Sequence, residues 1–331
     1  MKRFLKSILV IALCLSVSAC SQSTAPKEET ITIVDQAGRE VTLKKPAEKV
    51  VSGYYIATST LIGLGQKDKL VGVEMKADKR AIYQKAAPEI TSLPAMGNKK
   101  TFHIEECAKA APDVVFLPVS LKSSVDKLEE LGMKVILLEP ESMEGFDEAV
   151  NIIAKACGAQ EQAKRYFEYR DAIENNYLNQ TTTKKTVYFA GSDMLEASGE
   201  AMFQGELIKK AGGVNVITDH DQTSWMKISK ETLLKADPAY IFAENQGADI
   251  SAFTSEEAFK ELQAVKQEQV YTFPSALETW DTPNLSYCLG ELWMSSVLYP
   301  EAVSKQDVIK EATAFYKEFY GIEVSAQDLG I

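Results

Sequence analysis

Hydrophobic residues along the chain follow two spacings in turn. Short runs that are wholly apolar, or apolar at every second position, predict strands, whereas apolar residues three and four positions apart predict helices. Segments of the two kinds alternate on both sides of one long helical stretch. Such alternation is typical of parallel sheets covered by helices. We therefore expect an α/β fold of two lobes, each with a central, mostly parallel sheet flanked by helices.

The first half of the chain opens with a predicted hairpin at residues 31–45, where Asp35 to Gly38 supply the turn. Strands are then expected at residues 49–51, 69–74, 113–117 and 135–138, and helices at residues 54–64, 104–111 and 123–131. The second half repeats the alternation, with strands at residues 185–190, 239–243 and 270–273 and helices at residues 205–211, 230–236, 257–264 and 289–298.

The stretch between the halves has apolar residues at helical spacing. Phe146, Val150 and Ile153 share one face, Gly158 interrupts the pattern, and a second helix of about 20 residues starts near Ala159. A helix of that length can join two domains as one rigid rod. The expected organisation is a signal peptide (1–19), a lipidated tether (20–30), an N-terminal lobe (31–144), connecting helices (145–180) and a C-terminal lobe (181–331).

The N-terminus has the pattern of an export signal. Lys2, Arg3 and Lys6 precede a short apolar run, and small residues lead to Cys20. The run is too short to span a bilayer as a mature helix. It resembles a bacterial lipoprotein signal, which implies cleavage before Cys20 and lipidation of that residue; an ordinary secretory signal that contains a cysteine is the alternative. Residues 21–30 are polar and predict a flexible tether at the extracytoplasmic face of the cell membrane.

The charge of the chain excludes one class of partner. Its formal net charge is −11, from 36 basic and 47 acidic residues. A body with this excess of negative charge offers no surface for nucleic acid and is repelled by anionic lipid. We therefore expect contact with the membrane through the lipid anchor only.

Motifs of enzymes are absent from the sequence. There is no GxSxG, GxxxxGK[ST] or GxGxxG pattern, and Gly63-Leu64-Gly65 follows a predicted helix rather than a strand. Only two histidines occur, and the cysteines after Cys20 have no CxxC spacing, so bare zinc or manganese is disfavoured as cargo. We predict no catalytic residue, no metal site of side chains and no cofactor. An adhesive or structural lipoprotein is an alternative of another class.

Two glutamates occupy matched positions, one in each half of the chain. Glu105 lies seven residues before Pro112, and Glu231 lies seven residues before Pro238; a predicted strand follows each proline. Each glutamate is in the first turn of a predicted helix, where free N–H groups and the helix dipole favour an acidic residue. That preference explains each one separately. Their matched positions suggest instead a pseudo-twofold molecule that presents both.

Several segments share the pattern of one protein family. They are the leader, the hairpin ITIVDQAGREVTL, the segment KVVSGYY, the units EECAKAAPDVVFL and KETLLKADPAYIFA, the turn AGGVN and the segment WDTPNLSYCLGELWMSSVLYPE. Together they resemble the substrate-binding proteins of bacterial ABC importers for iron complexes, haem and cobalamin. The resemblance spans nearly the whole mature chain. It implies two lobes joined by one rigid helix, a ligand held in the cleft between them, and docking of Glu105 and Glu231 to an ABC permease that works with an ATPase.

Ligands of open α/β sheets bind at loops beyond the carboxyl ends of strands. Here those loops carry the candidate ligand-binding residues Tyr54, Tyr55, Asn98, Ser120, Trp225, Asn245, Trp280 and Asp281. Aromatic rings can stack on a planar or apolar ligand. The alternative is that Tyr54, Tyr55 and Trp225 pack on the lobe cores and that Asp281 is a solvated turn residue.

The composition narrows the cargo. Arginine is scarce after the leader, and no arginine is expected in a cleft loop. Highly anionic chelates are usually held by guanidinium groups, so a catecholate complex is disfavoured unless Lys99, Lys100 or Lys122 substitutes. We expect a metal complex, first an iron complex such as a siderophore or haem, then a corrinoid, then molybdate or another oxyanion.

Overall fold

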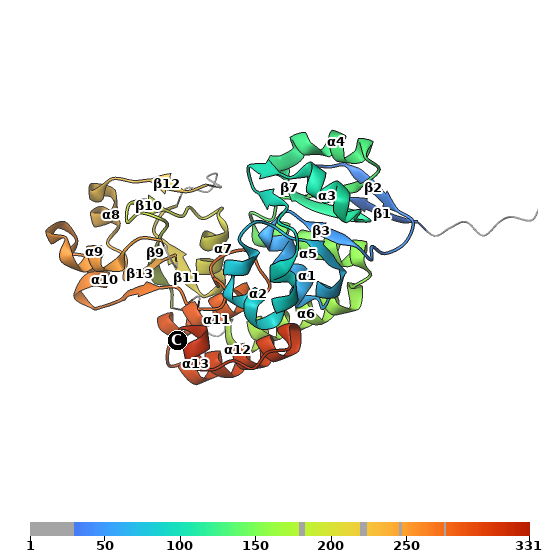
Figure 1. Ribbon diagram of the computed structural model, residues 1–331. Helices are drawn as coiled ribbons and strands as arrows, with labels where there is room; N and C mark the ends of the chain where they lie inside the picture. The colour runs from blue at the N-terminus through green and yellow to red at the C-terminus, as the bar shows by residue number, and fades with distance from the viewer. Residues whose placement is uncertain (1–29, 179–182, 219–223, 245–246, 275) are drawn as a thin grey trace, which may run out of the picture.

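The computed structural model describes residues 30–178, 183–218, 224–244, 247–274 and 276–331. The chain forms two lobes, which lie on the right and the left of Figure 1, with the last helices below them. Each lobe has a central, mostly parallel sheet flanked by helices. The α/β fold class predicted from the hydrophobic pattern is therefore confirmed.

The N-terminal lobe is built on a parallel sheet in the order β4-β3-β7-β8. Its strands are β3 (Val50–Ser52), β4 (Leu70–Gly72), β7 (Val114–Pro118) and β8 (Lys134–Leu138). In β7, Val115 and Leu117 join one apolar cluster, whereas Val114 and Phe116 join another on the opposite face. Burial on both faces explains why these strands are continuous apolar runs.

Helices and two hairpins complete this lobe. They are β1 (Ile31–Val34), β2 (Glu40–Leu43), α1 (Tyr55–Gly63), α2 (Ala81–Ala86), β5 (Gly97–Asn98), β6 (Thr101–Phe102), α3 (Ile104–Ala110) and α4 (Val125–Glu130). The hairpin β1–β2 is antiparallel, as predicted. The sequence pattern did not predict α2 or the short hairpin β5–β6.

The C-terminal lobe has a sheet in the order β12-β10-β9-β13-β14, with β11 also paired to β9. Its strands are β9 (Lys185–Ala190), β10 (Glu196–Ala197), β11 (Gly213–Asn215), β12 (Met226–Lys227), β13 (Tyr240–Ala243) and β14 (Val270–Thr272). Strands β9, β11, β13 and β14 are parallel, and β10 and β12 add an antiparallel edge.

The helices of this lobe are α7 (Phe203–Lys210), α8 (Lys230–Ala236), α9 (Ile250–Ser255), α10 (Gln263–Lys266) and α11 (Tyr287–Leu298). The helix predicted at residues 257–264 is wrong. A 3-10 turn (Glu257–Phe259) and the separate α10 occupy that region, and α9 precedes them. Phe253 and Phe259 are buried against each other, so packing rather than helical spacing determines the path.

The connection between the lobes consists of two helices with a sharp joint. Helix α5 (Met143–Cys157) ends at Gly158, whose φ of 72° lies in the left-handed region that glycine adopts easily. Helix α6 (Gln160–Ile173) continues into a π-helical turn, Glu174–Leu178. Helix α5 packs on α1 and β1, and the π-turn packs on α11. The second helix is therefore the element that links the two lobes.

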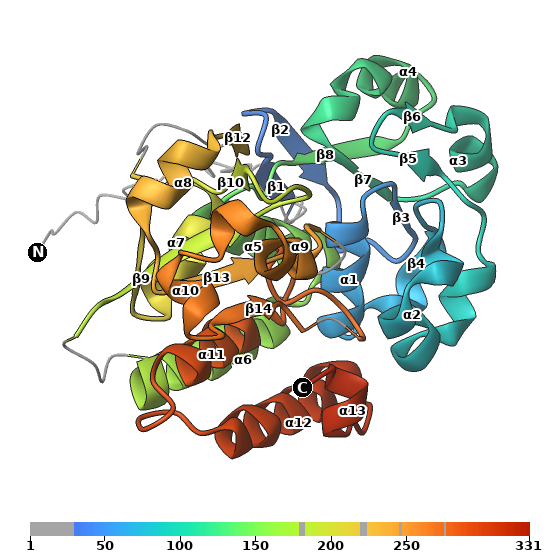
Figure 2. The same ribbon diagram turned by 90° about the vertical axis from the view of Figure 1, so that its left-hand side faces the viewer.

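The chain ends with α12 (Lys305–Tyr320) and α13 (Ala326–Leu329), which the sequence pattern did not assign. Helix α12 packs on α11 and also on α1 of the N-terminal lobe, and Figure 2 shows α12 and α13 beneath both lobes. A Cβ atom at Gly63 of α1 would lie 2.4 Å from Leu285 and 3.3 Å from Tyr320, so the approach is close. One buried apolar cluster includes residues of α1, α5, α6, α11 and α12. The two lobes therefore share a core at their base.

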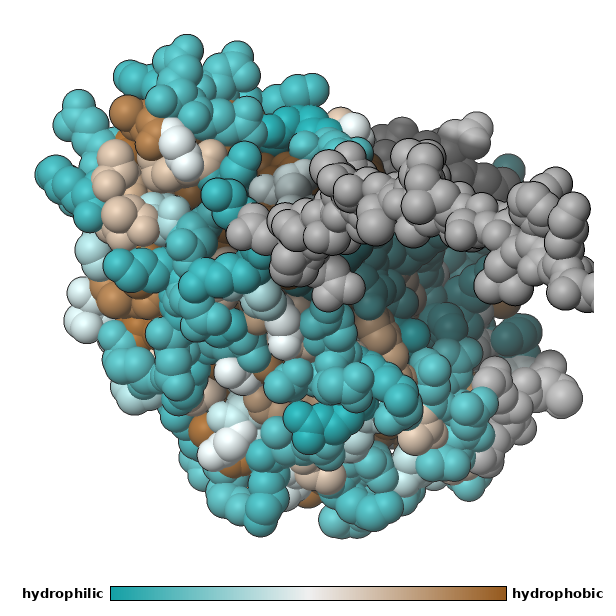
Figure 3. All heavy atoms as spheres, turned by 90° about the vertical axis from the view of Figure 1, so that its right-hand side faces the viewer, coloured by the Kyte–Doolittle hydropathy of each residue, from teal (hydrophilic) through white to brown (hydrophobic). Residues whose placement is uncertain are grey.

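The face shown in Figure 3 is mostly hydrophilic, with apolar residues scattered over it. In the part of the chain that the structure describes, no helix has the length and apolar character needed to span a bilayer.

Candidate functional site

The candidate site lies where strand ends of the two lobes approach each other. Strand β3 ends at Ser52 and leads to Tyr54 and Tyr55, while Glu244 follows β13 of the other lobe. The loop after β14, the strand that pairs with β13, contacts α1 directly, because the Ser59 hydroxyl donates to Glu278 Oε2 at 3.2 Å. We call this region the interlobe site. From the N-terminal lobe the site comprises Tyr54, Tyr55, Arg80, Lys99, Glu139 and Glu141. From the C-terminal lobe it comprises Trp225 and Glu244.

Tyr54 and Tyr55 form an aromatic wall at the start of α1. The chain passes close under them at Gly53, where a Cβ atom would lie 2.7 Å from Leu117. The two rings meet edge to face with centroids 5.4 Å apart. Tyr54 is only 2% exposed, whereas Tyr55 is partly exposed. Tyr55 is therefore the ring that a solute can contact, and Tyr54 supports it from behind.

Arg80 lies against this wall. Its guanidinium carbon is 4.6 Å from the centroid of the Tyr55 ring, and its Nε donates to Glu74 Oε1 at 3.1 Å. Glu74 is buried and also accepts hydrogen bonds from the hydroxyls of Thr58 (2.6 Å) and Tyr83 (3.0 Å). These partners satisfy the buried carboxylate and hold the arginine in place. The sequence analysis expected no arginine in a cleft loop, and the structure brings Arg80, from the segment before α2, against Tyr55.

Asn98 and Ser120 shape the loop that carries Lys99. The Asn98 side-chain oxygen accepts from the backbone N–H groups of Lys100 (2.8 Å) and Thr101 (3.1 Å), and the Ser120 hydroxyl donates to the Lys99 carbonyl (3.1 Å). The Lys99 ammonium then lies 5.5 Å and 5.3 Å from the centroids of the Tyr54 and Tyr55 rings. The structure thus shows both predicted polar residues supporting the backbone around Lys99.

Trp225 supplies the aromatic surface of the C-terminal lobe. It lies over Gly191, directly after β9, where a Cβ atom would be 2.8 Å from the indole. Its ring centroid is 6.2 Å from that of Phe189, and the side chain is partly exposed. Only glycine leaves room for the indole to lie this close to the strand end. Trp225 therefore packs over the end of β9 with part of its indole exposed, and its contact with a ligand stays a prediction.

Burial and nearby carboxylates affect the titration of the site. Burial raises the pKa of Tyr55 to about 12, Arg80 lowers it, and Glu141, Asp281 and Glu244 raise it. Burial also raises the pKa of Tyr54, with contributions from Tyr55, Glu141 and Glu139. Both phenols therefore stay protonated at neutral pH. Burial, assisted by Glu196, raises the pKa of Glu244 to about 7.

Trp280 and Asp281, both predicted to contact the ligand, are buried, so Asp281 is not a solvated turn residue either. Trp280 is 1% exposed, and its indole N–H donates to the Tyr316 hydroxyl at 2.9 Å. Asp281 is also 1% exposed, and its carbonyl accepts from Gln204. A Cβ atom at Gly290 of α11 would lie 2.1 Å from the Trp280 carbonyl, so this loop packs tightly on the helix. Packing on α11 and α12 therefore draws this loop into the core, although it is rich in polar residues.

Two predicted residues lie outside the described part of the chain, namely the ligand-site candidate Asn245 and the lipidation candidate Cys20.

Glu105 and Glu231 occupy equivalent places in the two lobes. Each is the second residue of a seven-residue helix, α3 or α8, and each is exposed. The two helices lie in the upper part of the molecule in both Figure 1 and Figure 2. Hydrogen bonds at the helix N-terminus, to the backbone and Ser229, lower the pKa of Glu231. Both glutamates are thus available to a partner that approaches this side.

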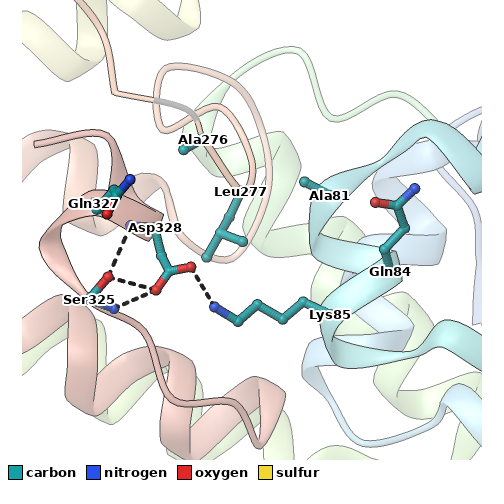
Figure 4. Close-up of a pocket in the computed structure, with 8 residues that line it drawn as sticks. All are labelled: Ala81, Gln84, Lys85, Ala276, Leu277, Ser325, Gln327 and Asp328. Atoms are coloured by element: carbon teal, nitrogen blue, oxygen red, sulfur yellow. Dashed lines mark hydrogen bonds and ion pairs between the residues drawn. The ribbon is translucent and has the colours of Figure 1, made fainter.

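A concave region lies between α2, α13 and residues 276–277. Its volume is about 750 Å³, and its lining residues are Ala81, Gln84, Lys85, Ala276, Leu277, Ser325, Gln327 and Asp328. Figure 4 shows Lys85 reaching Asp328 across it, with Nζ and Oδ1 2.7 Å apart. Among the described residues, no aromatic side chain lines this region. The interlobe site is therefore the better ligand candidate.

Among the described residues, no group of three or more histidine, cysteine, aspartate or glutamate side chains is arranged to hold a metal ion. Cys107, Cys157 and Cys288 are buried free thiols. Burial raises the pKa of Cys107 and Cys157 to about 12, which keeps both protonated.

Comparisons with known proteins agree with this architecture. The chain is 23% identical to the molybdate-binding protein MolA of Haemophilus influenzae, over 96% of each chain. It is 25% identical to a cobalamin-binding protein of Halobacterium salinarum, over 70% of this chain and 66% of that protein. The crystal structure of a periplasmic solute binding protein from Veillonella parvula superposes with a TM-score of 0.77 at 23% identity, covering 90% of this chain and 95% of that one.

The family match covers the residues that build the interlobe site in both lobes. Residues 50–277 match the family model described as periplasmic binding protein. This segment runs from β3 through the connecting helices to the loop after β14. Because it takes up more than half of the chain, the protein belongs to the family of periplasmic binding proteins.

Proposed function

We propose that this protein is the solute-binding component of an ABC importer, which captures an iron complex at the interlobe site and delivers it to the permease. The observation that carries the proposal is the pair of aromatic surfaces at the strand ends, Tyr55 on one lobe and Trp225 on the other. Partly exposed rings at such positions offer a large contact area to a solute held between the lobes. Family membership supports a binding rather than a catalytic role.

An iron complex suits the side chains better than a bare metal ion does. The described residues offer no cluster of imidazoles, thiolates or carboxylates that would encage an ion. Iron would therefore arrive inside a chelator, as in a ferric siderophore or haem. The protonated Tyr55 hydroxyl and the cations of Arg80 and Lys99 provide hydrogen-bond donors for oxygen atoms of such a chelate.

Two alternatives within the same class have support. A corrinoid is favoured by the flat aromatic surfaces and by the relative whose name states that it binds cobalamin. Molybdate is favoured by the relative named for molybdate binding and by the donors near Tyr55. An adhesive or structural lipoprotein is the alternative that needs no solute.

Delivery to a permease would use Glu105 and Glu231. Their exposed carboxylates sit on equivalent helices of the two lobes, so a two-subunit permease with basic residues at equivalent places would engage both. Lipidation at Cys20 would hold the protein at the extracytoplasmic face of the cell membrane, where it meets its permease and ATPase.

The test is to purify the full chain from its own host and examine what remains bound. We expect an absorption band of an iron chelate and one equivalent of iron by elemental analysis. Cobalt would instead indicate a corrinoid, and molybdenum would indicate the oxyanion. Protein that carries none of these, and shows no thermal shift with representatives of each class, would contradict a solute-binding role.

A further inference from the structure

The charges around the aromatic wall bear on the kind of solute that the interlobe site accepts, so this inference rests on the proposed function. The guanidinium carbon of Arg80 lies 4.6 Å from the centroid of the ligand-contacting Tyr55 ring. Its charge is already matched by the buried Glu74 at 3.1 Å. The ion pair as a unit therefore adds donors to the site but little net positive charge.

Carboxylates outnumber the remaining cation. Glu139 and Glu141 follow the carboxyl end of β8, next to the end of β7 in the same parallel sheet, and their charges act on Tyr54. Glu244 follows β13 on the opposite lobe, and its charge acts on Tyr55. Against these three stands Lys99, whose ammonium lies 5.3 Å from the Tyr55 centroid. Carboxylates of both lobes therefore follow the strand ends that border the tyrosine pair, in a chain whose overall charge is −11.

A solute that enters such a site is partly desolvated, so charge repulsion is screened less than it is on an open surface. A multiply charged anion would need several unpaired guanidinium or ammonium groups to offset the cost of desolvation and the repulsion by the carboxylates. The described residues of the site supply one ammonium and one arginine that is already paired. A neutral or cationic solute meets no such cost and gains the aromatic contacts.

We infer that the interlobe site selects solutes without net negative charge, such as neutral or cationic hydroxamate-type ferric chelates or a neutral corrinoid, over anionic chelates and oxyanions. The aromatic rings provide contact area, Tyr55 and Arg80 donate to ligand oxygens, and the carboxylates of both lobes reject anions. The relative that binds molybdate would then differ from this protein in the charge of its site.

The test is a titration of the full chain, in detergent at about pH 8, where Glu244 is mostly ionised because its pKa is about 7. The probes are ferrioxamine B (cationic), ferrichrome and cyanocobalamin (neutral), ferric citrate (anionic) and molybdate (dianionic). We expect at least one neutral or cationic probe to bind at least about tenfold more tightly than either anion, a difference of about 1.4 kcal/mol. An anion that binds most tightly overturns the inference and leaves the solute-binding role standing. Failure of every probe to bind overturns the inference together with the proposed function.

Charge-removing variants test the cause of the selection. Glu244→Gln and the double variant Glu139→Gln with Glu141→Gln should weaken a cationic probe by about threefold or more, strengthen an anionic probe similarly and leave a neutral probe unchanged. Glu257→Gln is the matched control, because its side chain is 88% exposed and pairs with Lys260 on the surface. Equal changes for cationic, neutral and anionic probes would show that the carboxylates act on the fold rather than on charge selection.

Discussion

In both lobes a seven-residue helix ends in a left-handed residue, and a proline then leads into a central strand. Helix α3 ends at Ala111 with φ 47° before Pro112, and α8 ends at Asp237 with φ 39° before Pro238. Glu105 and Glu231 occupy the same turn of these helices. The surfaces that meet between the lobes do not repeat in this way: one presents Tyr55 with Arg80, and the other presents Trp225 with Glu244.

This difference separates two tasks. The proposed permease, if it has two equivalent halves, would require equivalent contacts from both lobes, and α3 and α8 would supply them. A solute has no such symmetry, so the inner surfaces are free to differ in shape and charge. The repeat at the outside and the divergence at the inside therefore fit one molecule that contacts a symmetric partner and an asymmetric ligand.

The largest expected effect comes from removing the repeated feature. Glu105→Ala combined with Glu231→Ala should reduce solute uptake by cells to background while leaving the dissociation constant of the solute unchanged, because both side chains are exposed in the first turns of α3 and α8. Uptake assays and titration of the purified variant measure the two effects. Glu106→Ala with Glu257→Ala is the control, since it removes one partly exposed glutamate from the same helix as Glu105 and one exposed glutamate from the other lobe. Lost affinity would show instead that the pair supports the interlobe site.

Two of the three tryptophans, Trp225 and Trp280, sharpen the comparison between the interlobe surface and the core. Trp280→Ala should lower the free energy of unfolding by about 3 to 5 kcal/mol, because the ring is buried and bonded to Tyr316. Trp225→Ala should weaken solute binding by more than about tenfold with a smaller loss of stability, because the ring is partly exposed over Gly191. Chemical denaturation and solute titration of both variants distinguish the roles. Retained affinity in Trp225→Ala would remove it from the ligand site.

The pattern of the sequence predicted the lobes well because each is built from local repeats of strand and helix. Strand β9 and helix α8 agree with their predicted residues, and the helix–proline–strand units locate both central strands. The same reasoning could have found α12. Ser304 and Asp307 form a capping box, Val308, Ala312, Phe315 and Phe319 follow at helical spacing, and Gly321 ends the helix.

The interlobe site was predicted less completely, because contacts between distant segments determine it. Tyr54, Tyr55 and Trp225 were predicted from their positions in loops after strands, and the structure places them at strand ends of the two lobes. Arg80 had no such signal: it reaches Tyr55 only because Glu74, buried after β4, holds its guanidinium. Trp280 was misplaced for the opposite reason, since Tyr316 of α12 accepts its indole N–H and draws a polar loop into the core.

Buried carboxylates give the next smaller effect, which depends on pH. Glu291 of α11 is 2% exposed; burial raises its pKa to about 8, while Lys210 lowers it. In the unfolded chain this carboxyl group ionises near pH 4.3. Below that pH its burial does not lower the free energy of unfolding through ionisation, and the loss increases as the pH rises toward 8. Glu291→Gln should therefore raise the free energy of unfolding relative to wild type. This gain should be about 1 to 3 kcal/mol larger at pH 8 than at pH 5. Denaturation at the two pH values tests this, with Glu257→Gln as the exposed control. A difference that is the same at both pH values would show that Glu291 does not titrate in this range.

The smallest expected effect concerns the contact between the C-terminus and the N-terminal lobe. Lys85 and Asp328 form an ion pair at 2.7 Å, with side chains 33% and 37% exposed, and the backbone N–H of Ile82 donates to the Leu277 carbonyl nearby. An exposed pair contributes little, so Lys85→Ala should lower the free energy of unfolding by no more than about 1 kcal/mol.

Because α1, α6, α11 and α12 share one apolar cluster below the site, this loss should not let the lobes separate. We expect the small-angle scattering profiles of wild type and Lys85→Ala to coincide, with and without solute. An expanded profile for the variant would show that the ion pair, rather than the shared core, limits opening of the lobes.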